Sequence, residues 1–161
     1  MWVNAIASAG IPLIWGVGLA NLLHGVPLDS NGDFSGTFWD LFSGYTVLAG
    51  IAFVLVFAFH GAAFLTLRTT GDLLERAARA ARRLALPAAA VAAAFLIWTI
   101  AVAVDRNDKD VFPVILPAVI AITALLVAVY LVYAGKIGLA FSLTAIGTIA
   151  VVATLFTGLY P

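Results

Sequence analysis

The sequence contains no cysteine and few charged residues. The absence of cysteine among 161 residues excludes disulfides, thiolate catalysis and cysteine metal sites. Only 10% of the residues are charged and 64% are hydrophobic, whereas a soluble domain usually carries about 25% charged residues. So few charges cannot build a water-soluble surface, so we expect lipid to be the solvent for most of the exterior. The formal net charge of zero gives no general attraction to nucleic acid or to acidic partners.

Acidic residues and enzyme motifs are also missing from the hydrophobic segments. No Asp or Glu lies within them, although a proton-coupled or cation-coupled transporter normally carries one there. The sequence has no phosphate-binding glycine loop, no dinucleotide fingerprint, no His–Glu zinc motif and no Ser–His–Asp set. It therefore predicts no catalytic residue, no cofactor-binding residue and no metal ligand in this chain.

Five long hydrophobic runs fill most of the chain. Each has roughly 19 to 23 residues, the length at which a helix crosses a ~30 Å hydrocarbon core. We predict helices, because an isolated strand in lipid leaves its backbone polar groups unpaired. The expected spans cover about 5–23 (interrupted by Pro12), 45–67, 84–104, 114–134 and 137–158. The fold class is thus expected to be all-α, a polytopic transmembrane helical bundle that forms one membrane domain over residues 1–161.

The distribution of Lys and Arg predicts the orientation. Six of the eight basic residues follow the second or the fourth span. The positive-inside rule places these loops in the cytoplasm, with the N-terminus inside and the C-terminus outside. Residues 1–4 lack the positive charge of a signal peptide and no cleavage pattern follows, so the first span is expected to stay in the membrane.

A short helix and two polar turns are expected on the outer side. Thr37 and Asp40 fit a capping box, which predicts a short helix beginning at Phe38. The segment 29–33 has calcium-like residue types but not the spacing of a calcium loop, so a polar turn is predicted there. The charged segment 105–110 is predicted to be a solvated turn.

A charged helix over about 70–83 is expected on the cytoplasmic side. Thr69 and Asp72 fit a second capping box. Asp72–Arg76 and Glu75–Arg79 have the favourable i,i+4 polarity for ion pairs. The remaining arginines are expected to meet anionic lipid headgroups, and Arg68 is expected to anchor the second span.

Two histidines are the candidates for chemistry within or beside the spans. His60 lies seven residues before Leu67, so about 10 Å from the cytoplasmic end of its span. Its imidazole could be a packed hydrogen-bonding group, part of a polar path or a ligand. His24 lies at the outer end of the first span, too far in depth to share one haem iron with His60. Asn21, His24 and Pro27 predict either a capped helix end or a contact with a quinol headgroup or a partner subunit.

Small residues recur inside the expected spans. In lipid such residues allow helices to pack closely. The alanine-rich half of the third span is expected to be buried between other helices. Close packing is likewise expected at Gly16, Gly18, Gly50, Gly61, Gly138 and Gly147.

Several segments together resemble subunit II of the cytochrome bd-type quinol oxidases. Residues 16–29 read GVGLANLLHGVPLD, residues 31–42 read NGDFSGTFWDLF, and residues 65–77 read LTLRTTGDLLERA. Residues 48–50 (LAG), 60–62 (HGA) and 156–161 (FTGLYP) are also similar to the family. The resemblance is dense over residues 10–80 and rests mainly on hydropathy beyond them. The family-like positions, expected to be structural or subunit contacts, are Asn21, His24, Pro27, His60, Arg68, Thr69, Gly71, Glu75 and Arg76.

The resemblance implies a multi-pass subunit of a bacterial inner-membrane complex that oxidises quinol and reduces oxygen to water. Haem b and haem d are then expected on the partner, the haem-bearing subunit I, and a quinone is possible. This chain would bind no cofactor alone and would not be catalytic on its own. It would pack against the haem-bearing subunit and stabilise it.

The chain departs from the family pattern at several places. The Gly-Phe-Asp and Trp-Asp-Gly-Asn-Glu motifs of the family's first two spans do not occur, the family's last span has no counterpart, and Ser43-Gly44 replaces a usual Asn-Pro. The chain thus resembles the middle spans of the family. Two alternatives stay open: a small transporter, channel or scaffold, with Pro12, Pro113 and Pro117 as helix breaks, and an independent haem protein that uses His60.

Overall fold

The computed structural model describes residues 2–27, 29–106 and 112–159. Its five long helices are apolar enough to cross a membrane, which confirms the predicted all-α polytopic fold. The predicted outer turn at 105–110 lies outside the described residues from residue 107 onward. The elements in chain order are α1 (Trp2–His24), the 3-10 helix η1 (Phe38–Leu41), α2 (Gly44–Arg68), α3 (Gly71–Arg106), α4 (Phe112–Tyr133) and α5 (Ile137–Leu159).

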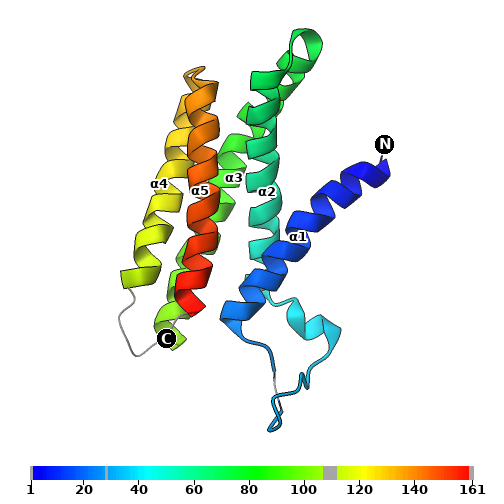
Figure 1. Cartoon of the computed structure of the whole chain (residues 1–161), viewed down its shortest axis with the longest axis vertical. Helices are drawn as coiled ribbons and strands as arrows, with labels where there is room; N and C mark the ends of the chain where they lie inside the picture. Colours follow the sequence, from blue (N-terminus) through cyan, green and yellow to red (C-terminus); the bar gives the residue numbers. More distant parts are fainter. Residues whose placement is uncertain (1, 28, 107–111, 160–161) are drawn as a thin grey trace.

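The helices α2, α3, α4 and α5 run side by side, while α1 crosses α2 obliquely (Figure 1). The C-terminal half of α1 packs on the bundle, and its N-terminal half leans away from it. Residues 3–9 are accordingly exposed, whereas Ala20 and Leu23 are buried in the core. The long loop that carries η1 then leads back to the start of α2 at the same end of the bundle (Figure 1).

The prediction that Pro12 interrupts the first span is wrong. The helix α1 is continuous through Pro12, as α3 is through Pro87 and α4 through Pro117. Pro113 is the second residue of α4, where no intrahelical N–H bond is lost. In a membrane bundle, local adjustments and neighbouring groups can satisfy the carbonyls that an internal proline frees. The expected proline positions therefore give no broken helix among the described residues.

The charged helix and the third span form one helix of 36 residues, α3. The predicted capping box at Thr69 and Asp72 is wrong, because Thr69 ends α2 instead of starting α3. Its backbone N–H and its hydroxyl both reach the carbonyl of Leu65, the hydroxyl at 2.7 Å. The chain then reverses at Gly71, whose φ of 61° is a conformation that glycine adopts without steric cost.

Small side chains allow the helices to approach closely. On α3, alanines at helical spacing are buried against α2 and α4, whereas Ala90 and Ala94 on its opposite face are exposed. The expectation of a buried alanine-rich half is thus right for one face only. The buried alanines of α3 are Ala77, Ala81, Ala85, Ala88, Ala89, Ala92 and Ala103.

The crossing of α1 and α2 depends on two glycines. A Cβ atom at Gly16 would lie 2.7 Å from the Cα of Gly50 and 2.8 Å from the carbonyl oxygen of Ala49. A Cβ at Gly50 would lie 3.0 Å from the carbonyl oxygen of Leu13. Gly147 is similarly close to Leu125. The close-packing prediction therefore holds for these three glycines.

At the other three predicted glycines a Cβ would meet no atom within 4 Å, so close packing within this chain was wrongly predicted there. Those positions are Gly18, Gly61 and Gly138.

We predict that Gly16→Val separates α1 from α2 and lowers the free energy of unfolding by about 1–3 kcal/mol, the usual cost of overpacking. The control is Gly18→Val, which makes the same change in helix propensity but has open space around it. Helix content followed during denaturation in mild detergent would measure both. Equal losses in the two variants would contradict backbone contact at the crossing.

Candidate functional site

A buried hydrogen-bonded pair joins α2 to α3 at the end of the bundle where α1 stops. Tyr45 is 1% exposed and Thr99 is fully buried. Their hydroxyl oxygens are 3.0 Å apart, and the Thr99 hydroxyl donates to the carbonyl of Phe95 at 2.9 Å. Because that bond uses the single hydroxyl proton of Thr99, the Tyr45 hydroxyl is the donor of the pair. Tyr45 is thus a core residue.

Two of the predicted site residues lie at the end of α1. Asn21 is 7% exposed, and its amide donates to the carbonyls of Val17 at 2.9 Å and Leu41 at 2.8 Å. It therefore fastens the end of α1 to η1. The ring of His24, the last residue of α1, lies 5.7 Å from the ring of Tyr45.

Pro27, the third residue predicted in this region, belongs to the exposed loop. Its carbonyl accepts a hydrogen bond from the N–H of Ser35 at 3.1 Å. The polar turn expected at 29–33 is present: the Asp29 carboxylate accepts from the N–H groups of Asn31 and Asp33, both at 2.9 Å. These hydrogen bonds therefore close a turn in the loop that joins α1 to η1.

The predicted capping box at η1 is confirmed. The Asp40 carboxylate accepts from the backbone N–H of Thr37 at 2.6 Å and from the Thr37 hydroxyl at 2.9 Å. These two hydrogen bonds, first the backbone one, hold the pKa of Asp40 below its usual value. The carboxylate therefore stabilises the start of η1 in its ionised form.

A second polar pair joins α2 to α5. The Nδ1 atom of His60 lies 2.7 Å from the hydroxyl of Thr144, and the imidazole stacks on Phe141 with centroids 4.5 Å apart. The Thr144 hydroxyl donates to the carbonyl of Phe141 at 2.8 Å. We assign the Thr144 proton to this bond, so that Nδ1 donates to Thr144 and Nε2 carries the lone pair. The tautomer of His60 is thus fixed by its neighbour.

The Nε2 atom of His60 accepts no hydrogen bond from the described residues, and it is not enclosed by them. His60 lies eight residues before the last residue of α2, and Thr144 lies seven residues after the first residue of α5. Both positions correspond to a depth of about 10–12 Å from the helix ends. The polar pair therefore presents one acceptor on the side of the bundle, well inside the span.

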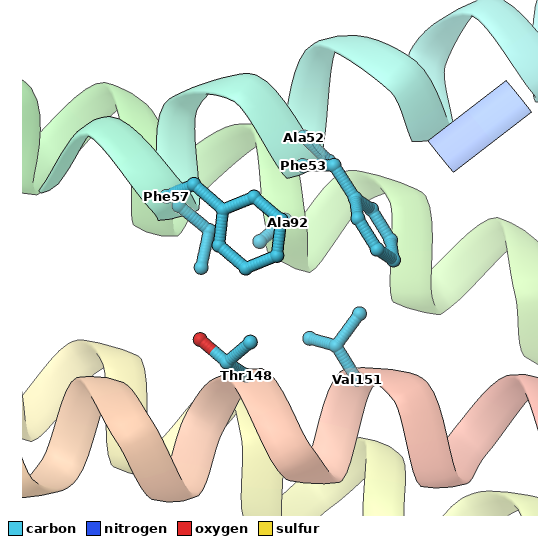
Figure 2. A pocket seen from close by; sticks show the side chains of 7 residues that line it. Ala52, Phe53, Phe57, Ala92, Thr148 and Val151 are labelled. Atoms are coloured by element: carbon cyan, nitrogen blue, oxygen red, sulfur yellow. The ribbon is translucent and has the colours of Figure 1, made fainter. Parts of the chain in front are cut away.

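The seam between α2 and α5 continues from this pair as an apolar hollow. Figure 2 shows Thr148 and Val151 of α5 facing Phe53 and Phe57 of α2 across it. The Thr148 hydroxyl donates within its own helix, to the carbonyl of Thr144 at 2.8 Å. The complete lining is Ala52, Phe53, Val56, Phe57, Ala92, Thr148 and Val151.

The remaining predicted site residues build the turn between α2 and α3. The guanidinium of Arg68 lies 5.8 Å from the ring centre of Phe64. Glu75 and Arg79 form the predicted i,i+4 ion pair at 3.4 Å, with both side chains exposed. Arg76, also exposed, makes no ion pair with a described carboxylate, so the predicted pair with Asp72 is not formed. Thr69 and Gly71 shape the reversal described above.

The structure keeps the two histidines apart. His24 contacts Tyr45, and His60 lies fifteen residues further along α2, which corresponds to about 22 Å. Within the described ranges there is no group of three or more His, Cys, Asp or Glu that could hold a metal ion. Two axial histidines from this chain therefore do not fit one haem iron.

Sequence reasoning missed the buried threonines that partner these side chains. Four threonines are fully buried: Thr46, Thr99, Thr144 and Thr154. A threonine within an apolar span signals a hydroxyl that must be satisfied inside the bundle. The sequence therefore shows that these hydroxyls need partners, but the identity of each partner depends on which helix faces the threonine.

Five apolar membrane-length helices, tied by hydrogen bonds between side chains of neighbouring helices, define a polytopic helical membrane protein. The family model of cytochrome bd terminal oxidase subunit II matches residues 1–161. The chain belongs to this family, which confirms the resemblance drawn from the sequence.

Curated relatives agree with the family match. The chain is 28% identical to the cytochrome bd ubiquinol oxidase subunit 2 of Bacillus subtilis (strain 168), over 99% of this chain and 47% of the relative. It is 35% identical to the cytochrome bd-I ubiquinol oxidase subunit 2 of Escherichia coli (strain K12), over 53% of this chain and 24% of that relative. The chain thus spans about half the length, or less, of the curated relatives it matches.

We predict that Tyr45→Phe lowers the free energy of unfolding by about 0.5–1.5 kcal/mol, because it removes one buried hydrogen bond and leaves the Thr99 oxygen without its donor. Tyr130→Phe, at a position 70% exposed, is the matched control. Denaturation in detergent would measure both. A Tyr45 variant as stable as the control would contradict the assigned bond.

The lowered pKa of Asp40 predicts the pH dependence of η1. A carboxyl whose folded pKa lies below its unfolded value, about 3.9, stabilises the fold above that value, and this contribution is lost as the pH falls through the folded pKa. The amide chemical shift of Thr37 should follow this titration, and Asp40→Asn should abolish it. A titration at the ordinary value of an exposed carboxyl would refute the assignment.

Proposed function

We propose that the chain is a non-haem subunit, or part of one, of a cytochrome bd-type terminal oxidase. It packs against the haem-bearing subunit and stabilises it during quinol oxidation and oxygen reduction. Haem b and haem d belong to that partner, and a quinone is a further candidate ligand of the complex. Family membership over residues 1–161 supports this assignment.

The single observation that carries the packing role is the lone acceptor at His60. A polar group without a partner in the hydrocarbon core costs several kcal/mol. No described residue donates to Nε2, and a lipid tail has no donor to offer. A hydroxyl or N–H group of a neighbouring subunit would satisfy it. The seam between α2 and α5 is therefore the face that we assign to the haem-bearing subunit.

The charges support the direction of insertion. The arginines of the α2–α3 turn and the start of α3 lie at one end of the bundle (Figure 1). The positive-inside rule places this end in the cytoplasm of a bacterial cell, with the multi-pass chain in the inner membrane. The N-terminus is then inside, the C-terminus is outside, and His60 lies in the cytoplasmic half.

We predict that His60→Phe weakens recovery of the haem-bearing subunit by about threefold to twentyfold. This corresponds to the roughly 0.6–1.7 kcal/mol measured for hydrogen bonds between membrane helices. The tagged chain would be coproduced with its cognate haem-bearing subunit, extracted in mild detergent and assayed by a reduced-minus-oxidised spectrum. His60→Gln keeps a donor for Thr144 and an acceptor oxygen, so it should retain more of the partner.

Thr148→Val is the control, because it removes a hydroxyl of the same seam that bonds only within α5. Unchanged recovery in His60→Phe would overturn the assigned contact. Haem absorbance in the purified chain alone, lost in His60→Phe, would favour a haem ligand instead. Purification of the chain without a partner and without haem absorbance would favour a scaffold. Solute flux into liposomes that contain this chain would favour a transporter.

A further inference from the structure

The exposed face of α3 changes from charged to apolar along its length. At 1.5 Å per residue, 36 residues extend about 54 Å, well beyond a ~30 Å hydrocarbon core. The first part of α3 therefore emerges from the hydrocarbon. Arg76, Arg79 and Arg83 are exposed there, and their i, i+3, i+7 spacing puts them on one face of the helix.

These three arginines surround a shallow hollow of about 440 Å³. Its apolar part is formed by Ala80 and Leu84. Arg79 is partly neutralised by Glu75 at 3.4 Å, whereas Arg76 and Arg83 have no described carboxylate within ion-pair distance. The hollow thus offers two guanidinium groups that are free to bind an anion, and guanidinium matches phosphate with paired hydrogen bonds.

The same face continues into the membrane as a track of small residues. Pro87, Ala90 and Ala94 are exposed, and the larger Leu86 and Ile97, at 60% and 62% exposure, lie along one side of them. From Arg83 to Ala94 the helix rises about 16 Å, close to the depth of one leaflet. The length of the track and its small side chains therefore suit one acyl chain.

We propose that this face of α3 binds an anionic phospholipid, with its phosphate between Arg76 and Arg83 and an acyl chain along Pro87, Ala90 and Ala94. The arginines at the head of an apolar track favour an amphiphile over free phosphate, which would use the hollow alone. They also favour a lipid over a partner helix, for which the small residues by themselves would suffice. The site lies on a different helix from His60, so it does not depend on the contact proposed above.

The test uses the full chain, purified with any subunits that accompany it, and native mass spectrometry with added phosphatidylglycerol or phosphatidylcholine. The double variant R76Q/R83Q should bind phosphatidylglycerol about 25-fold more weakly, at roughly fivefold per arginine. The control R68Q/R82Q has the same charge change outside the hollow and should stay within about twofold of the original protein. Circular dichroism would establish that both variants are folded.

A third variant tests the track, because Ala94→Trp fills it and leaves every arginine in place. It should weaken phosphatidylglycerol binding without changing the response to inorganic phosphate. Equal losses in the two arginine variants, or no preference for phosphatidylglycerol, would overturn the proposal. Displacement of the lipid by millimolar phosphate, with Ala94→Trp silent, would show an anion site only. Loss of a partner subunit in Ala94→Trp with lipid binding intact would show a helix-docking face.

Discussion

Hydrocarbon offers no hydrogen bonds, and the arrangement of this bundle depends on that constraint. Several threonine hydroxyls within the helices donate to a carbonyl of their own helix, and two of these threonines also meet a side chain of the helix opposite. Thr99 does both: it donates to Phe95 in its own helix and accepts from Tyr45. Thr144 has the same arrangement, donating to Phe141 and meeting His60. These two pairs fix the register of α2 against α3 and α5 at opposite ends of the bundle.

Between these polar ties, the helices are held by close contact of small residues. Apolar side chains gain nothing from leaving lipid, so packing distance and shape decide which helices associate. Gly16 and Gly50 let α1 and α2 approach until backbone meets backbone. Buried alanines such as Ala85 and Ala88 do the same for α3. The N-terminal half of α1 leans away from the bundle although it also contains small residues, among them Ala5, Ala7 and Ala9 (Figure 1).

The two proposed surfaces rest on groups that have no partner among the described residues. His60 uses Nδ1 for Thr144 and leaves an acceptor on the α2–α5 seam. Of the three arginines that line the hollow on α3, Arg79 pairs with Glu75, and Arg76 and Arg83 have no described carboxylate partner. One surface suits a protein partner with a donor at that depth, and the other suits a lipid with a phosphate. Both fit a subunit that belongs to a larger membrane complex.

The sequence by itself determined the five helices and the start of η1, because span length, hydropathy and a capping box act over neighbouring residues. The break predicted at Pro12 is wrong, because α1 continues through it. The capping box predicted at Thr69 is wrong, because its hydroxyl bonds back to the carbonyl of Leu65 and ends α2. Only the tertiary structure decided which glycines touch another helix and that His60 meets Thr144, 84 residues away. These depend on which faces the helices turn toward each other, and uniform hydrophobicity around an apolar helix does not encode that choice.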